Sequence, residues 1–516
     1  MEWVDVEVSA GRVRGSQRNG AATFLGVPFA AAPVGDLRFR GPVPAIGWSG
    51  IRDATHFGPT PLRREIAQAT TIPEECVPGL ATLNVNVFTP APGDLGARLP
   101  VLAWIHGGGY TGGSPASAWY DGRAFNRSGI VTVTVSYRLG FDGFGWIDGA
   151  PPNRGLMDQV AALRWIRENI EQFGGDPHRV TLAGQSAGGG SVLALLSTPS
   201  AEGLFSSAIV QSGAPSRMSE ESAKEITRRM GSVAQISATD VAAWSAVSEE
   251  AILRAQLEVT SVVTACTLSG LDAESLVVRL ANPLLDHLRL PFGPVVDNES
   301  LLDFEAAQFR GLHRGIPLLI GSTHNELAAP YEEGLDALIP GALERRGMSA
   351  AAVRAFGREA QRLGPGASYR QLMAHGVIRL ATVHIADTRR ASGAASRTWL
   401  YDFRHFTQES PIAAHCHELP FVWDCLDAPG VREALGSRPS QWMADVMHSD
   451  WARFIRSGHC GWPSVDGAGD GARTYARTHR YRRDAYQLEL ELLRSCDSRN
   501  HQLDSNSEQE DRRNVK

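Results

Sequence analysis

The chain has 516 residues, of which 43% are hydrophobic and 21% are charged, and it carries a formal net charge of −6 at pH 7. This balance of apolar and charged residues excludes an intrinsically disordered chain. The excess of acidic residues gives no overall basic character of the kind that nucleic-acid binding requires, so no nucleic-acid partner is expected.

The first residues and the cysteines indicate a compartment. Three of the first seven residues are acidic, which is unlike a signal peptide, and no run approaches the roughly 18 apolar residues of a membrane span. The cysteines are scattered, unlike a disulfide framework: Cys76, Cys266, Cys416, Cys425, Cys460 and Cys496. We therefore expect a cytoplasmic protein with free thiols and no membrane partner.

Short apolar or β-branched runs, bounded by turn residues, alternate with helical patterns. The expected strands lie at 100–105, 130–136, 179–183, 208–211, 317–320 and 398–403. Between the second and third strands, apolar residues at steps of three or four predict a helix that ends at Gly174-Gly175: Leu156, Val160, Leu163, Ile166 and Ile170. This alternation predicts an α/β fold with a mostly parallel central sheet covered by helices on both faces.

Two stretches are helical and less regular, at about 212–291 and 327–397, and we interpret them as insertions over one edge of the sheet. Residues 497–516 are polar and lack aromatic side chains, so a disordered tail is expected. At about 150 residues per domain the length alone would suggest three domains. Nothing between these points resembles a linker, however, and residues 1–496 are predicted to form one domain.

The first candidate for catalytic chemistry follows the strand at 100–105. His106 is succeeded by three glycines, whose backbone N–H groups are free to point into a cavity and bind an oxyanion. A phosphate-binding loop is the competing interpretation, but it requires a Lys and a Ser or Thr after the glycines. We assign oxyanion binding to Gly108, Gly109 and, from the segment described next, Ala187.

The second candidate is Gly184-Gln185-Ser186-Ala187-Gly188, which has the Gly-x-Ser-x-Gly form. A strand leads into it, and an apolar run that can open a helix follows. A nucleophile elbow has this arrangement, because a sharp strand-to-helix turn exposes the serine hydroxyl above the sheet. An ordinary glycine-rich turn is the alternative. We expect Ser186 to be a nucleophile.

A serine hydroxyl needs a histidine base and a carboxylate that orients it. In this arrangement they follow in the order Ser, acid, His, just beyond the ends of later strands. Glu326 follows the strand at 317–320 and is the candidate acid. Beyond the strand at 398–403 lie His415 and His417, which position alone does not separate.

At this point the sequence resembles the type-B carboxylesterase and cholinesterase-like family of α/β hydrolases, from about residue 6 to 475. The resemblance is carried by Phe24–Ala30, Pro33–Phe39, Asn153–Gln159 and Phe173–Pro177, together with the elbow. It implies an α/β-hydrolase fold with helical insertions over an active-site gorge.

The resemblance also implies roles for single residues. Ser186 is the nucleophile, Glu326 the acid and His415 the base, since His415 precedes Glu418-Leu419-Pro420-Phe421-Val422. It implies the same oxyanion residues, and a supporting role for Ser212 beside the catalytic histidine.

Three features depart from the family pattern. Cysteines are absent near Thr60 and Thr82, where many members carry a disulfide loop. Gln185 stands where Glu is commoner, so one carboxylate near the histidine is missing, which predicts an altered pH dependence. Leu327 replaces a glycine that often follows the acid.

The resulting hypothesis is a serine carboxylesterase that hydrolyses small-molecule carboxylic esters through an acyl-enzyme, with no cofactor and no metal. The same machinery would serve a lactonase, a carbamate or amide hydrolase, or a biosynthetic acyl transferase. A non-catalytic binding protein is a further alternative, since this fold also carries binding modules. A zinc site on His415-Cys416-His417-Glu418 is another.

Three aromatic residues are candidates for lining the substrate pocket: Tyr110, Trp119 and Trp423. Each is also an ordinary candidate for aromatic core packing. The sequence predicts neither the width of the gorge nor the oligomeric state.

Overall fold

The computed structural model of the chain describes residues 2–18, 20–61, 71–236, 241–265, 272–282, 290–326, 334–466 and 471–495. Within these residues, one 13-stranded sheet has the order β1-β2-β3-β5-β7-β6-β8-β9-β12-β13-β14-β15, with β4 paired to β2. The strands are β1 (Glu2–Val8), β2 (Gly11–Arg18), β3 (Ala21–Pro28), β4 (Ile51–Asp53), β5 (Asn84–Thr89), β6 (Leu99–Ile105), β7 (Val131–Val135), β8 (Gly175–Gln185), β9 (Ser207–Gln211), β12 (Leu318–Thr323), β13 (Thr398–Phe403), β14 (Ala472–Tyr475) and β15 (Arg480–Arg482).

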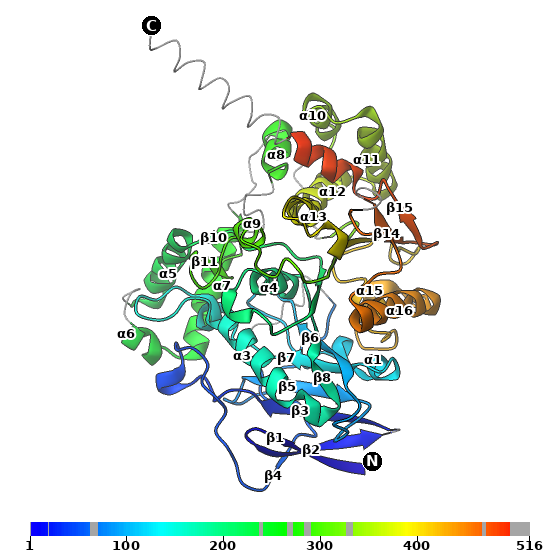
Figure 1. Cartoon of the computed structure of the whole chain (residues 1–516). Helices are drawn as coiled ribbons and strands as arrows, with labels where there is room; N and C mark the ends of the chain where they lie inside the picture. The colour runs from blue at the N-terminus through cyan, green and yellow to red at the C-terminus, as the bar shows by residue number, and fades with distance from the viewer. Residues whose placement is uncertain are drawn as a thin grey trace.

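The central part of the sheet confirms the predicted parallel arrangement. The seven adjacent strands from β7 to β14 in the sheet order form six pairs, all of them parallel. The strand predicted at 398–403 has the bounds of β13. Strands β1 to β5 were not predicted from the sequence; of these, β1, β2, β3 and β5 form an antiparallel extension. Figure 1 shows these amino-terminal strands at one end of the molecule and α10 to α13 at the other.

The described helices are α1 (Arg123–Arg127), α2 (Gly140–Phe144), α3 (Arg154–Asn169), α4 (Ala187–Leu195), α5 (Glu220–Ala234), α6 (Val241–Ala246), α7 (Glu249–Ala265), α8 (Ala273–Leu280), α9 (Phe304–Phe309), α10 (Ile339–Arg345), α11 (Ala350–Leu363), α12 (Ala367–Ala374), α13 (Leu380–Ala391), α14 (Leu419–Val422), α15 (Val431–Leu435) and α16 (Gln441–Ser457). The helix predicted before Gly174 is α3, extended by a 3₁₀ turn at Ile170–Phe173. Gly174 ends it with a φ of 77°, a conformation that favours glycine.

Alternate side chains of the central strands enter two separate hydrophobic cores, one on each face of the sheet. On β6, Val101, Ala103 and Ile105 join the first core, while Leu102 and Trp104 join the second. Residues of α3, α4 and α13 complete the first core, and residues of α1, α14 and α16 complete the second. Because both faces of the sheet are buried, the sequences of the central strands are nearly continuous apolar runs.

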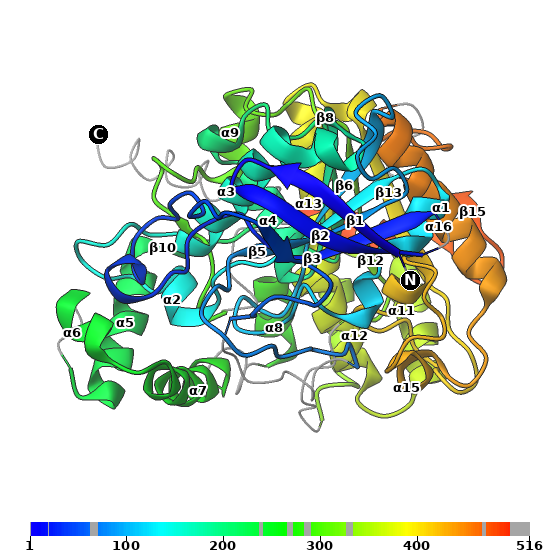
Figure 2. The same ribbon diagram turned by 90° about the horizontal axis from the view of Figure 1, so that it is seen from below.

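Helices occupy both stretches that were interpreted as insertions. Between 212 and 291 the structure describes α5 to α8 and a two-residue strand β10 (Met218–Ser219), which pairs with β11 (Val295–Val296). Figure 2 shows α5, α6 and α7 grouped together at one flank of the molecule. Between 327 and 397 lie α10 to α13. The tail predicted at 497–516 and the departure at Leu327 fall outside the described residues.

The sequence led us to expect no membrane-spanning segment and free cysteine thiols. Among the described helices, none has both the length and the apolar character needed to cross a bilayer. Four of the cysteines lie in the described part of the chain, and all of them are free thiols: Cys76, Cys416, Cys425 and Cys460.

Candidate active site

Ser186 lies in a sharp turn between β8 and α4. Its φ of 57° and ψ of −126° are unusual for a residue with a side chain, and mark local backbone strain. The turn is fixed by hydrogen bonds from the Ser186 N–H to the Gln211 carbonyl (2.8 Å) and from the Gly190 N–H to the Ser186 carbonyl (2.9 Å). A Cβ on Gly188 would lie 2.1 Å from the Ile105 carbonyl oxygen, so helix and strand approach closely here. This is the strand-turn-helix geometry that a nucleophile elbow needs.

The glycine-rich loop after β6 lies directly against this turn. A Cβ on Gly107 would be 3.0 Å from the Cβ of Ser186, so the loop backbone borders the serine. Gly108 has a φ of 121°, and a Cβ there would lie 2.2 Å from the Gly112 carbonyl oxygen. The N–H groups of Gly108 and Gly109 donate no hydrogen bond to any described residue. The structure therefore brings two predicted donors and Ser186 together.

The loop is held from behind by His106. Its Nδ1 lies 2.8 Å from the Gly107 carbonyl oxygen, and its ring stacks on Tyr137 with the centroids 4.6 Å apart. The Tyr137 hydroxyl in turn donates to the His106 carbonyl at 2.9 Å. Aromatic packing beneath the glycines thus gives the flexible sequence a defined path.

Glu326 and His415 meet at the far side of the site. Nδ1 of His415 lies 2.5 Å from Oε2 of Glu326, and the His415 N–H donates to the Glu326 carbonyl at 3.1 Å. The second carboxylate oxygen of Glu326 accepts the Thr323 N–H at 2.8 Å. His417 makes no such contact, and burial lowers the pKa of its imidazole to about 4. The structure therefore places His415, and not His417, beside the candidate acid.

Burial and charge act in opposite directions on His415. Burial disfavours the imidazolium, but Cys416 and the Glu326 carboxylate favour it, and the pKa of His415 is raised well above its usual value. Burial also raises the pKa of the Cys416 thiol, so this thiol is neutral near pH 7. The Glu326 carboxylate is therefore the charge that stabilises a protonated His415.

Gln185 contacts the other ring nitrogen of His415. The side-chain Nε2 of Gln185 lies 3.1 Å from Nε2 of His415. An amide nitrogen only donates, so in the neutral imidazole Nε2 of His415 accepts here and Nδ1–H donates to Glu326. In the described part of the chain, Ser186 Oγ makes no hydrogen bond of its own. The imidazole tautomer suits a base, and the amide of Gln185 occupies its lone pair.

Glu418, named above in the family motif and in the zinc hypothesis, is a buried carboxylate. Gln211 donates to its Oε1 at 3.2 Å, and its Oε2 has no partner in the described residues. Burial and the negative charge of Glu326 raise the pKa of Glu418 to about 7.

The other predicted residues lie around this centre. Ser212 follows β9 with a φ of 49°, and its buried Oγ has no partner among the described residues. Tyr110 packs under α4, since a Cβ on Gly190 would lie 2.5 Å from the tyrosine hydroxyl. Trp119 and Trp423 are fully buried in the second core. The indole nitrogen of Trp119 donates to the Pro429 carbonyl at 2.7 Å. A pocket role for these three aromatic residues stays a prediction.

The zinc hypothesis concerns the stretch His415-Cys416-His417-Glu418. His415 is committed to Glu326 through Nδ1, and its other nitrogen contacts Gln185. Across the described ranges, no three His, Cys, Asp or Glu side chains gather as the ligands of a metal would.

The chain is similar in sequence to proteins of a known family. Residues 3–362 match the model of the carboxylesterase family. The chain is 32% identical to the para-nitrobenzyl esterase of Bacillus subtilis (strain 168), over 88% of this chain and 90% of that protein. It is also 32% identical to the phenmedipham hydrolase of Pseudarthrobacter oxydans, over 87% and 89% of the two chains.

Solved structures give the same result. A carboxylesterase from Geobacillus stearothermophilus superposes with a TM-score of 0.75 at 31% identity, covering 95% of this chain and 99% of that one. A thermophilic PNB esterase superposes with a TM-score of 0.77 at 28% identity and the same coverage.

Proposed function

The chain belongs to the carboxylesterase family and is a carboxylic ester hydrolase, and from this premise we propose that Ser186, Glu326 and His415 form its catalytic triad. One junction carries the proposal. Nδ1 of His415 contacts Glu326 at 2.5 Å, while its Nε2 lies 3.1 Å from the side chain that immediately precedes Ser186. Three segments far apart in the sequence thus meet around one imidazole.

The reaction then follows from the roles of these groups. Ser186 Oγ attacks the ester carbonyl carbon as His415 Nε2 takes its proton, and Glu326 stabilises the imidazolium. The N–H groups of Gly108, Gly109 and Ala187 bind the oxyanion of the tetrahedral intermediate. As the C–O bond to the alcohol breaks, His415 returns the proton to the leaving oxygen. Water then attacks the acyl-enzyme by the same steps and releases the acid and Ser186.

Gln185 adds one step before the attack. Its amide donates to the same Nε2 that must accept the serine proton, so the contact must be exchanged for one from Ser186 Oγ when substrate binds. Because Gln185 is neutral, this exchange does not require an ion pair with His415 to be broken. A glutamate at this position would instead add a negative charge beside the imidazole.

Small carboxylic esters are the proposed substrates, and the relatives' names give the first ones to try. Para-nitrobenzyl and p-nitrophenyl esters both release a chromogenic or readily detected alcohol. Tyr110, Trp119 and Trp423 are proposed to border the acyl or alcohol pocket, with Ser212 supporting His415. Water is proposed as the acyl acceptor, and a cytoplasmic location is proposed for the reaction.

The test is hydrolysis of a p-nitrophenyl ester series, from acetate to decanoate, by the wild type and Ser186→Ala. We expect kcat to fall by at least about 10⁴-fold, because the nucleophile is lost. Ser191→Ala is the matched control: Ser191 lies on α4, fully buried, and accepts a hydrogen bond from Gln159 at 3.1 Å. It should retain kcat.

Labelling with an organophosphate gives an independent readout, expected as one covalent adduct on Ser186. Wild-type activity in Ser186→Ala would overturn the assignment of the nucleophile. A wild type that hydrolyses no ester of the series and forms no adduct would favour the non-catalytic binding protein instead.

A further inference from the structure

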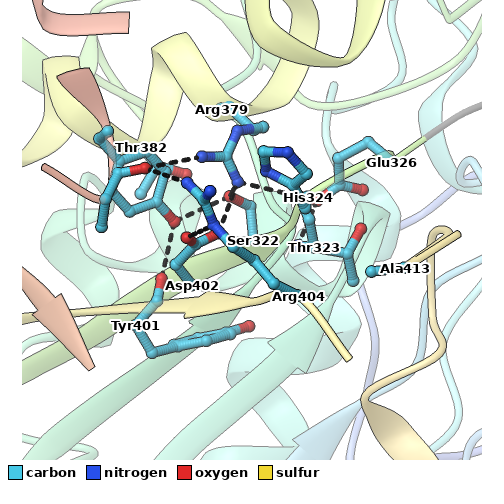
Figure 3. Close-up of polar contacts among 12 residues, drawn as sticks. Ser322, Thr323, His324, Glu326, Arg379, Thr382, Tyr401, Asp402, Arg404 and Ala413 are labelled. Atoms are coloured by element: carbon cyan, nitrogen blue, oxygen red, sulfur yellow. Dashed lines mark hydrogen bonds and ion pairs between the residues drawn. The ribbon is translucent and has the colours of Figure 1, made fainter. Parts of the chain in front are cut away.

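A buried network of charged side chains lies behind the loop that carries Glu326. It is centred on Arg379, which is fully buried between the carboxyl ends of β12 and β13. Figure 3 shows Arg379, Asp402 and Arg404 on one side of Thr323 and Glu326 on the other. Arg379 comes from the π-helical turn η5 (His375–Arg379), and such turns often occur at functional sites.

Arg379 uses its guanidinium to join three segments. It donates to Oδ1 of Asp402 at 2.8 Å, to the Thr323 carbonyl at 3.2 Å and to the Ala485 carbonyl at 3.3 Å, and it also pairs with Glu489. Burial opposes its charge, but Glu489 and Asp402 raise its pKa. In the same way, burial opposes the charge of Glu489, but Arg379 and His375 lower its pKa. Both groups are therefore charged at neutral pH.

A second path leads from Glu489 to the residues just before Glu326. Oε1 of Glu489 lies 2.5 Å from Nδ1 of His375, and Nε2 of His375 lies 3.1 Å from the amide of Gln371. The same amide donates to the His324 carbonyl at 3.1 Å, while Oε1 of Gln371 accepts from Asn325 at 2.8 Å. Gln371 thus uses all its polar atoms. Two of its contacts are to residues 323–326, which we call the acid loop.

The acid loop needs such support because Glu326 is strained. Its φ of 35° is a left-handed conformation that a residue with a side chain adopts only when its surroundings impose it. The three preceding residues are each fixed. Thr323 is bound by Arg379, His324 by Gln371 and Phe403, and Asn325 by Gln371 and Ala413.

We propose that Arg379 and Gln371 are positioning residues that hold Glu326 against His415, and that Glu489 ties this support to the helical segment 487–495. This inference rests on the proposed role of Glu326 as the acid of the triad. It makes the distance between the Glu326 carboxylate and the His415 imidazole depend on a segment about 160 residues after Glu326 in the sequence.

The opposite ends of the same strands supply a matched control. Arg389 is also fully buried, on the last turn of α13, and binds Thr398 Oγ1 at 2.7 Å and the Ile316 carbonyl at 2.7 Å, at the amino ends of β13 and β12. Its partner is the buried Gln308, whose Oε1 accepts from Arg389 at 3.0 Å. A buried arginine and a buried glutamine therefore occur at both ends, although Arg379 and Gln371 are linked through Glu489 and His375 and not directly. Only Arg379 and Gln371 contact the acid loop.

The experiment compares Gln371→Met, Glu489→Gln and the control Gln308→Met in the full-length protein. For each, kcat, KM and the acidic limb of the pH profile of kcat/KM are measured on a p-nitrophenyl ester, together with Tm and active-site titration by organophosphate. Met keeps the size of Gln and removes its hydrogen bonds, and Gln keeps the shape of Glu and removes its charge.

For Gln371→Met we expect kcat per titrated site to fall about 10- to 100-fold with KM nearly unchanged. The acidic limb should move to lower pH, because a displaced Glu326 no longer raises the pKa of His415. Glu489→Gln should shift the limb in the same direction by less. Gln308→Met should lower Tm and leave the acidic limb unchanged. Cys416 and Glu418, the other titratable groups near the His415 imidazole, are present in every variant and do not account for a difference between them.

The inference is overturned if Gln371→Met and Glu489→Gln lower Tm as Gln308→Met does but keep the wild-type pH profile. Glu326→Gln separates this outcome from a failure of the proposed function. If Glu326→Gln itself keeps the wild-type kcat and acidic limb, the triad assignment fails and the positioning role fails with it. If Glu326→Gln moves the limb and the two network variants do not, only the positioning role is wrong.

Discussion

At the scale of single residues, the imidazole of His415 is the point where the site is tuned. A buried histidine that contacts one carboxylate has its protonated form stabilised, which lowers the fraction of free base at a given pH. Gln185, the residue before the proposed nucleophile, contributes a neutral amide at 3.1 Å from Nε2 of His415 instead of a second negative charge. Gln185 therefore keeps the pKa of the base lower than a glutamate at the same position would.

Replacing Gln185 by glutamate tests this directly. The added carboxylate stabilises the imidazolium, so the pKa of His415 rises and the base is protonated at higher pH. The acidic limb of kcat/KM should move up by about 1 to 3 pH units, as expected for an opposite charge within 4 to 6 Å. The measurement is a pH profile on one p-nitrophenyl ester.

Gln185→Met is the matched variant, since it removes the amide without adding a charge. Its acidic limb should stay within a few tenths of a unit of the wild type. A Gln185→Glu profile that coincides with that of Gln185→Met would show that charge at this position does not reach His415.

At the scale of elements, two tight turns place the proposed nucleophile and the proposed oxyanion loop in contact. The elbow and the loop belong to neighbouring strands, β8 and β6, which pair in parallel and therefore end at the same edge of the sheet. Glycines line the contact because backbone atoms from both turns occupy the space of a side chain. The motif residues are thus required by packing as much as by chemistry.

Gly108→Ala is expected to disrupt the loop. A Cβ at this position would lie 2.2 Å from the Gly112 carbonyl oxygen, at a φ of 121°, so the loop must move and its N–H groups move with it. Loss of one oxyanion donor lowers kcat by about 10²- to 10³-fold. The measurement is kcat and KM on a p-nitrophenyl ester.

Gly20→Ala is the control for backbone strain alone. Gly20 has a φ of 79° with nothing within 4 Å of an added Cβ, and it precedes β3, remote in sequence from the elbow and the loop. We expect a small loss of Tm and an unchanged kcat. If Gly108→Ala also kept its kcat, the oxyanion assignment of this loop would be wrong.

At the scale of the whole molecule, buried ion pairs connect the motifs that carry the family resemblance. Asp158, in the stretch Asn153–Gln159, forms a two-pronged pair with Arg138 at 2.7 and 2.8 Å. Arg138 also donates to the carbonyls of Arg38 and Arg40, in the segment that follows the amino-terminal strands. This stretch therefore acts structurally, by fastening the amino-terminal segment and α3 to the central sheet.

Arg138→Met should therefore destabilise the protein. The change leaves Asp158 buried without its charged partner, which typically costs about 3 to 5 kcal/mol. The measurement is the free energy of unfolding in urea, followed together with esterase activity. Arg12→Met is the comparison, because Arg12 and Glu7 form an exposed pair at 3.2 Å. That variant should change stability by less than about 1 kcal/mol. Equal effects of the two changes would contradict the role of burial.

The features that depend on local pattern could be predicted from the sequence. Parallel strands, the helix ended by Gly174, the elbow at Ser186 and the glycine loop follow from hydrophobic periodicity and turn residues within about 20 neighbours. The amino-terminal strands were missed because charged or polar residues interrupt them, such as Glu2, Asp5 and Glu7 in β1, whereas the central strands were recognised as nearly continuous apolar runs. The tertiary structure decided what depends on contacts between distant residues. His415 meets Glu326 across 89 residues and Gln185 across 230, and Arg379 meets Glu489 across 110. Only the assembled sheet brings such pairs together, because the order of strands in space differs from their order in the chain.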